Sequence, residues 1–281
     1  MGGWTLDDIP WHAFDASRID PKLVPAIKAA SLVEYNAGDY RTYLGNVFHD
    51  DPRALKAFEG WADEEVQHGR ALGRWAELAD PNFDFEQSFA RFTAGYRIPV
   101  AAADSVRGSR AGELIARCVV ETGTSSYYSA LAEATDEPVL EAICRRIAAD
   151  EFAHYHLFRG LLKRYLGRDK LGPWRRFRIA VGRLNESGDD ELAYAYHAAN
   201  RHGQPYNRRS AAAAYGRAAL GYYTPDLIER ALEMVFGAIG LGWARPLTRA
   251  LGWLGWGLLR ARLALHGLIA RLSEALPQPA K

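Results

Sequence analysis

Cysteine is scarce in this chain, and its placement supports neither a disulfide framework nor a zinc site. The only two cysteines in 281 residues, Cys118 and Cys144, form no Cys-x-x-Cys pair and no zinc motif. A disulfide-stapled secreted domain is therefore excluded, and free thiols of this kind indicate a reducing cytoplasm. We interpret both cysteines as small core residues.

An excess of charge and a long apolar run are also missing. Lys and Arg number 35 against 34 Asp and Glu, and the net charge of +1 predicts no strong attraction to nucleic acid. The first residues, MGGWTLDDIPWHAF, have acidic groups where a secretion signal needs basic ones and have no apolar core. In residues 246–276 the longest uncharged run is ten residues, 250–259, which is too short to span a bilayer.

The chain does contain two copies of a Glu-x-x-His motif. Glu151 and His154 lie within EAICRRIAADEFAHYHLF, and Glu65 and His68 lie within GWADEEVQHGRALGRW. On a helix, residues three apart share a face, so each carboxylate and imidazole project toward one point. One such pair is a weak signal, since polar residues one turn apart usually form a solvated face.

The two motifs belong to a longer repeat that also includes two glutamates. Glu34 precedes Glu65 by 31 positions, and Glu121 precedes Glu151 by 30. Thirty residues correspond to two half-helices and a tight turn, which return the chain antiparallel to the same height. Each half of the repeat is then a helical hairpin, and two packed hairpins bring four glutamates and two histidines together.

Four buried carboxylates carry a charge of −4, which a domain cannot bury without compensation. Two divalent cations cancel that charge, and carboxylate oxygens with imidazole suit iron or manganese better than zinc. The sequence therefore predicts an all-α, ferritin-like four-helix bundle with a di-metal centre and additional C-terminal helices. The predicted metal ligands are Glu34, Glu65, His68, Glu121, Glu151 and His154.

Helical patterns divide the chain into residues 1–240, which hold the di-metal domain and accessory helices, and residues 241–281. We expect long helices over about 21–48, 52–78, 108–134 and 138–165, and a short crossover helix over about 85–96. Asp51 and Asp136 are the expected N-caps of the second and fourth long helices.

Two basic segments follow the motifs. Residues 161–183 contain eight Lys and Arg against one Asp, and indicate either a solvated linker or a docking patch for an acidic partner or membrane surface. Residues 245–276 combine Arg and Trp with an amphipathic pattern that fits a helix lying in a membrane interface. The alternative is a helix that packs on the bundle or on another subunit.

The motifs resemble those of the soluble acyl-acyl carrier protein desaturases. WADEEVQHG is similar to that family's second-helix signature, IAADEFAH to its fourth-helix signature, and LGYYTPDLIERALEMVFGAI to a later Gly-x-Tyr-Thr segment. The resemblance covers residues from about 34 to 240. It implies that Glu34 and Glu121 are terminal ligands and that Glu65 and Glu151 bridge two irons.

The same resemblance implies roles for three further residues. Asp150 and Trp61 would orient His68, and Thr124, three residues after Glu121, would assist oxygen activation. It also implies O2 as cosubstrate, an acyl carrier protein that delivers the substrate, a ferredoxin-type electron donor and a homodimer.

Two iron ions, or a manganese and an iron, with O2 would remove two hydrogens from an unactivated acyl chain. We therefore expect a cytoplasmic fatty-acyl desaturase. Two alternatives remain open on the sequence alone. One is a hydroxylase of another hydrophobic substrate, bound peripherally at the inner face of the membrane, and the other is a ferritin-like iron-oxidising protein.

Overall fold

A computed structural model describes residues 3–185, 190–242 and 245–275, and no strand occurs among them. The all-α prediction is therefore confirmed for this part of the chain. In order, the helices are α1 Val24–Tyr35, α2 Ala37–Val47, α3 Pro52–Ala79, α4 Phe85–Gly95, α5 Arg110–Ala134, α6 Pro138–Asp169, α7 Pro173–Asn185, α8 Asp190–Asn200, α9 Arg208–Ala219, α10 Pro225–Ile239 and α11 Arg245–Ala275.

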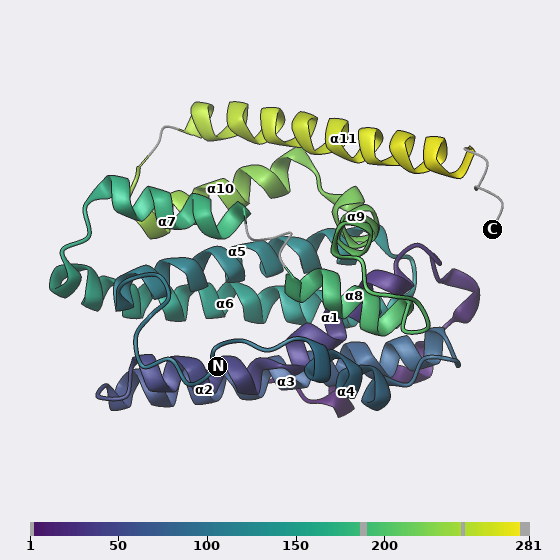
Figure 1. The fold of residues 1–281 in the computed structure, drawn as a ribbon, viewed down its shortest axis with the longest axis horizontal. Coiled ribbons are helices and arrows are strands. Elements are labelled where there is room, and N and C mark those ends of the chain that lie inside the picture. The colour runs from purple at the N-terminus through teal and green to yellow at the C-terminus, as the bar shows by residue number, and fades with distance from the viewer. Residues whose placement is uncertain (1–2, 186–189, 243–244, 276–281) are drawn as a thin grey trace.

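The helices stack in layers (Figure 1). Figure 1 shows α2, α3 and α4 at the bottom, the pair α5 and α6 across the middle, α7 and α10 above them, and α11 along the top. Helix α1 packs on α3, α5 packs on α6, and α3 contacts α6. The four helices with the predicted ligands are therefore packed into one group, with α8 against α1 and α10 against α5.

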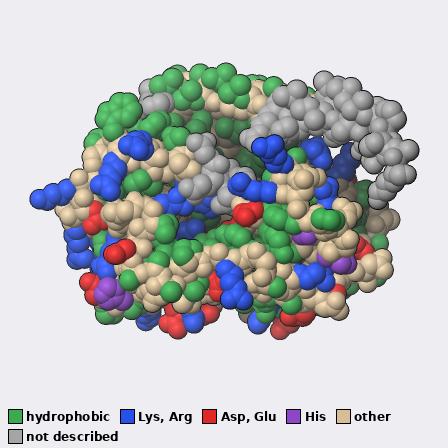
Figure 2. All heavy atoms as spheres, viewed as in Figure 1, with side chains coloured by type: hydrophobic (Ala, Val, Ile, Leu, Met, Phe, Trp, Pro, Cys, Tyr) green, Lys and Arg blue, Asp and Glu red, His purple; other side chains and the backbone are tan. Residues whose placement is uncertain are grey.

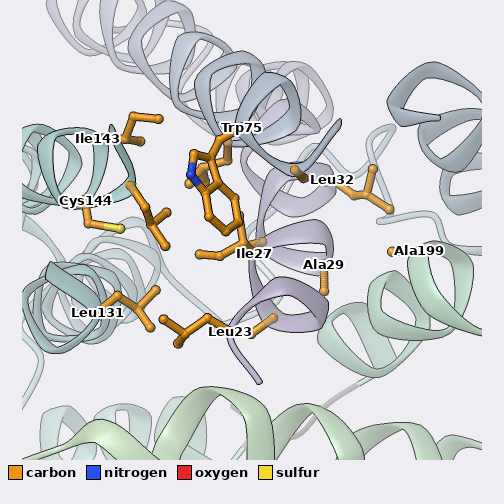
Figure 3. Close-up of a cluster of buried hydrophobic side chains, with 14 of the residues drawn as sticks. Leu23, Ile27, Ala29, Leu32, Trp75, Leu131, Ile143, Cys144 and Ala199 are labelled. Atoms are coloured by element: carbon orange, nitrogen blue, oxygen red, sulfur yellow. The ribbon is translucent and has the colours of Figure 1, made fainter. Parts of the chain in front are cut away.

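The apolar core has two parts, one on each side of the predicted ligands. One cluster gathers Ile27, Trp75, Leu131 and Ile143, whose side chains point toward one another in Figure 3. The other contains the rings of Phe48, Phe58, Phe158 and Tyr165. In α3, α5 and α6, the predicted ligands have residues of one cluster before them in the helix and residues of the other cluster after them. Glu34 is placed in the same way, with one cluster on α1 before it and the other on α2 after it. Both ends of the site are thus closed by apolar side chains.

The predicted single helix over 21–48 is wrong, because the chain breaks at Asn36 between α1 and α2. Asn36 has φ −80° and ψ 8°, and its N–H donates to the carbonyl of Val33, three residues back. This tight turn lies where α3 approaches the chain closely, since a Cβ placed on Gly69 would be 2.5 Å from the nitrogen of Tyr35. The helical pattern of the segment does not predict this close approach, because the approach is a tertiary contact.

One of the two expected caps is found and the other is corrected. The carboxylate of Asp51 accepts from the backbone N–H groups of Arg53 and Ala54 at the start of α3. At the start of α6 the cap is Glu137, not Asp136, and its carboxylate accepts from Val139 and Leu140. Glu137 is held there because it also accepts from Trp75 Nε1 at 2.7 Å.

Substituting Gly69 with alanine should destabilise the fold by about 3 kcal/mol, because the new methyl group would overlap the backbone of Tyr35 rather than a flexible side chain. Chemical denaturation measures the loss. Gly60→Ala, on the same helix, is the matched control, since a methyl group added there would have no atom within 4 Å and helix propensity favours alanine. Equal effects at both positions would contradict the close approach.

The C-terminal helix α11 covers residues 245–275 and packs along α10. Part of the predicted amphipathic segment lies outside what the structure describes. Residues 243–244 and 276–281 are not described at all, and for Arg245, Arg262 and residues 265–275 only the backbone is described. Within the described chain, no helix combines the length and apolar character needed to cross a bilayer.

Candidate metal centre

The six predicted ligands converge from four helices. They form two overlapping groups, within each of which one ligand atom per residue lies no more than 4.8 Å from the others. The first group is Glu34, Glu65, His68 and Glu151, and the second is Glu65, Glu121, Glu151 and His154. Glu65 and Glu151 belong to both groups, which is the arrangement that two adjacent metal ions with bridging carboxylates require.

The two imidazoles present the same nitrogen to the shared carboxylates. His68 Nδ1 lies 3.3 Å from a carboxylate oxygen of Glu151 and 3.5 Å from one of Glu65. His154 Nδ1 lies 3.3 Å from the other oxygen of Glu65 and 3.7 Å from Glu121. Each histidine thus approaches the carboxylates of the opposite hairpin as well as those of its own helix.

The residues present fit a metal ion in their chemistry as well as in their spacing. All six side chains are buried, with exposed fractions from 0 to 7%. His68 Nδ1, His154 Nδ1, Glu121 Oε1 and Glu151 Oε1 are buried without a hydrogen-bond partner. Buried polar atoms are normally satisfied. Cations coordinated by these unpaired atoms would satisfy them and would offset the repulsion among the carboxylates.

Without a cation, bound protons must offset part of the repulsion among the carboxylates. Burial, followed by the negative charge of neighbouring carboxylates, raises the pKa of Glu34 and of Glu121 well above the usual value. Burial acts to lower the pKa of His154, but the adjacent carboxylates of Glu64 and Glu65 outweigh it and raise the pKa to about 11. The metal-free site therefore retains protons near neutral pH, and metal binding must displace them.

Each histidine is oriented from behind by an acidic residue on the opposite hairpin. His68 Nε2 lies 3.0 Å from Asp150 Oδ2, and His154 Nε2 lies 2.7 Å from Glu64 Oε2. Such contacts fix the imidazole tautomer and direct the other nitrogen toward a metal. The structure therefore places Asp150 beside His68. It also adds Glu64, which sequence reasoning missed although an acidic residue precedes the glutamate of the Glu-x-x-His motif in both copies of the repeat.

Trp61 does not occupy the place expected for it. Its indole packs edge-on against Phe158 at 5.5 Å, and its Nε1 is buried without a hydrogen-bond partner. The indole at Asp150 is that of Trp4, whose Nε1 donates to Asp150 Oδ2 at 2.6 Å and whose ring stacks on His68. Trp4 lies in an irregular N-terminal segment, so no helical spacing pointed to it.

Two hydroxyl groups reach the carboxylates from α5. Thr124 Oγ1 donates to Glu151 Oε2 at 2.5 Å, so the structure places Thr124 beside a shared carboxylate. The phenol of Tyr128 donates to Glu34 Oε1 at 2.5 Å and is fully buried. The helical pattern of the sequence places Tyr128 on the same face as Glu121 and Thr124 but indicates no role for it.

Replacing Asp150 with alanine should weaken metal binding by about 10- to 100-fold, because His68 would lose the partner that orients its ring. Trp4→Phe should have a smaller effect in the same direction, since it removes only the hydrogen bond to Asp150. Titration of the metal-free protein with Fe²⁺ measures both. Asp63→Ala, an exposed carboxylate on α3, is the control. Unchanged affinity in Asp150→Ala would show that this contact does not support the site.

No protein-family model matches the chain, and a search of curated proteins gave no match. The nature of the site therefore rests on its geometry and on the sequence motifs.

Proposed function

We propose that the protein is a di-iron, O2-dependent oxidoreductase that desaturates a long acyl chain. In this proposal α1, α3, α5 and α6 form a ferritin-like bundle around the two ions. The observation that carries it is the pair of ligand groups that share Glu65 and Glu151. A single structural ion would need one group, whereas two groups with common carboxylates suit a pair of ions that react together.

The donor set favours iron or manganese over zinc. Each group offers three carboxylates and one imidazole, a hard set that suits iron or manganese, whereas structural zinc sites are usually closed and tetrahedral. A pair of ferrous ions, when bound, supplies two electrons to O2 and yields an oxidant strong enough to attack an unactivated carbon chain.

The protein's own groups hold and shield this chemistry. Glu64 and Asp150 would orient the histidines, and Thr124 donates a hydrogen bond to Glu151, a carboxylate that belongs to both ligand groups. The apolar clusters on both sides of the carboxylates keep bulk water away and surround the site with side chains compatible with a hydrocarbon.

The desaturase assignment rests on the motifs shared with the acyl-acyl carrier protein desaturases, including the threonine that follows Glu121. It entails an acyl carrier protein that delivers the substrate and, by the same resemblance, a homodimer. An external donor such as a ferredoxin must also reduce the ions, because Cys118 and Cys144 are buried, separate thiols whose pKa is raised by burial.

The test is to measure the metal content of the purified chain and then to supply the reduced protein with O2, an electron donor and acyl carrier substrates. About two irons per chain and a product about two mass units lighter than the substrate would support desaturation. A gain of about sixteen mass units would replace it with hydroxylation. Iron turnover without an organic product would favour an iron-oxidising role, and absence of bound metal would reject the whole proposal.

A further inference from the structure

Helix α11 exposes its large apolar side chains to solvent. Leu247, Leu254 and Leu258 have exposed fractions of 48%, 59% and 63%. Their separations of seven and four residues place them on one face of the helix. Figure 2 shows hydrophobic side chains gathered along the top edge of the molecule, where Figure 1 places α11. A contiguous apolar stripe of this kind marks an interaction surface.

The face of α11 that packs on α10 carries small residues. A Cβ on Gly252 would lie 3.1 Å from the Cβ of Glu229, and one on Gly255 would lie 3.4 Å from Ile228. Glycines thus allow a close approach between the two helices, and Trp256 anchors the same side by donating from Nε1 to the carbonyl of Tyr223 at 3.0 Å. An ordinary surface helix buries its leucines and exposes polar groups. Here Leu247, Leu254 and Leu258 face outward, and Leu251 packs against the core.

The charged side chains of α11 that precede Glu274 are all positive. Between Glu233 and Glu274 the sequence contains no Asp or Glu, and it contains five arginines, whereas the chain as a whole is almost neutral. Arg249, Trp253 and Arg260 are exposed and follow one another at four and seven residues, which places them together about 140° around the helix from the leucines, so that the two sets flank the outward side of α11. Arginine and tryptophan on a helix that also exposes a row of leucines are typical of helices that lie in the headgroup region of an anionic bilayer.

We propose that α11 is a peripheral anchor that lies in the plane of an anionic lipid surface. Leu247, Leu254 and Leu258 would enter the acyl boundary, and Arg249 and Arg260 would meet the phosphate groups. A second copy of the chain is a poorer occupant, because between residues 233 and 274 the sequence offers no acidic residue with which the exposed arginines of a partner could pair.

Binding is tested by cosedimentation of the full chain with vesicles of phosphatidylcholine and phosphatidylglycerol in equal amounts, and with vesicles of phosphatidylcholine alone. We expect the chain to prefer the anionic vesicles by at least about tenfold. The triple substitution Leu247→Ser, Leu254→Ser and Leu258→Ser should weaken binding by more than about 100-fold. Arg249→Gln with Arg260→Gln should weaken it by about tenfold to thirtyfold.

The matched control combines Leu78→Ser and Val106→Ser, which remove two exposed apolar side chains outside α11 and should leave binding unchanged. Insertion is read separately from Leu254→Cys labelled with an environment-sensitive dye. The label is selective because both native cysteines are buried. A blue shift on anionic vesicles is expected.

Three results would overturn the proposal. The first is equal affinity for both kinds of vesicle, and the second is unchanged binding in the leucine variant. The third is a wild-type dimer that ignores vesicles and becomes monomeric in the leucine variant, as measured by light scattering. None of these readouts depends on metal or turnover, so the anchor can fail without affecting the proposed chemistry.

Discussion

Replacing both Glu65 and Glu151 with glutamine should reduce the bound metal from about two ions per chain to none, a loss of affinity of more than about 1000-fold. These are the two residues common to both ligand groups, so each group loses two of its three carboxylates. Glutamine keeps the volume of the side chain and so limits the change to charge and coordination. Oxidation of any substrate should disappear with the metal.

Single substitutions of the two glutamates that belong to only one ligand group distinguish the two ions. Glu34 belongs only to the group with His68, and Glu121 only to the group with His154. Each of Glu34→Gln and Glu121→Gln should therefore weaken one ion more than the other, leaving about one metal per chain at limiting concentration. Glu141→Gln, an exposed carboxylate paired with Arg145 on α6, is the control for the helix. Retention of two ions in the Glu65 and Glu151 double variant would refute the bridging assignment.

The metal-free protein should lose stability as the pH rises from about 6.5 to 9, by on the order of 3 kcal/mol. His154 has its pKa raised to about 11 in the folded chain, because the adjacent carboxylates of Glu64 and Glu65 outweigh the opposing effect of burial. A group whose pKa is raised on folding stabilises the fold fully below its unfolded value. That stabilisation is lost as the pH rises toward the folded value.

The other buried groups with raised pKa values act in the same direction. Glu34 and Glu121 have raised pKa values through burial and neighbouring carboxylates. Burial acts to lower the pKa of His68, but its carboxylate neighbours, chiefly Asp150, outweigh it and raise the pKa. When metal binds, these protons leave, so the loaded protein should become more stable relative to the metal-free protein as the pH rises. Chemical unfolding at both pH values, with chelator and with saturating Fe²⁺, measures the contrast. Metal-free protein as stable at pH 9 as at pH 6.5 would contradict it.

The sequence alone determined the composition of the site because its spacing depends on helix geometry. Residues three apart share a helical face, and thirty residues return a hairpin to the same height, so the repeat of Glu34, Glu65 and His68 as Glu121, Glu151 and His154 placed all six together. The all-α class and the short crossover helix follow from the same periodicity. These features depend on contacts within one helix or between neighbours along the chain.

Only the tertiary structure decided which residues support that site. Trp4 reaches Asp150 across 146 positions of sequence, and Glu64 reaches His154 across 90. The break at Asn36, the cap at Glu137 and the outward leucines of α11 likewise depend on Gly69, Trp75 and α10, which approach from other parts of the chain. Helical periodicity determines which side chains share a face. The packing of distant segments determines which other residues that face contacts, and a local sequence pattern does not predict those contacts.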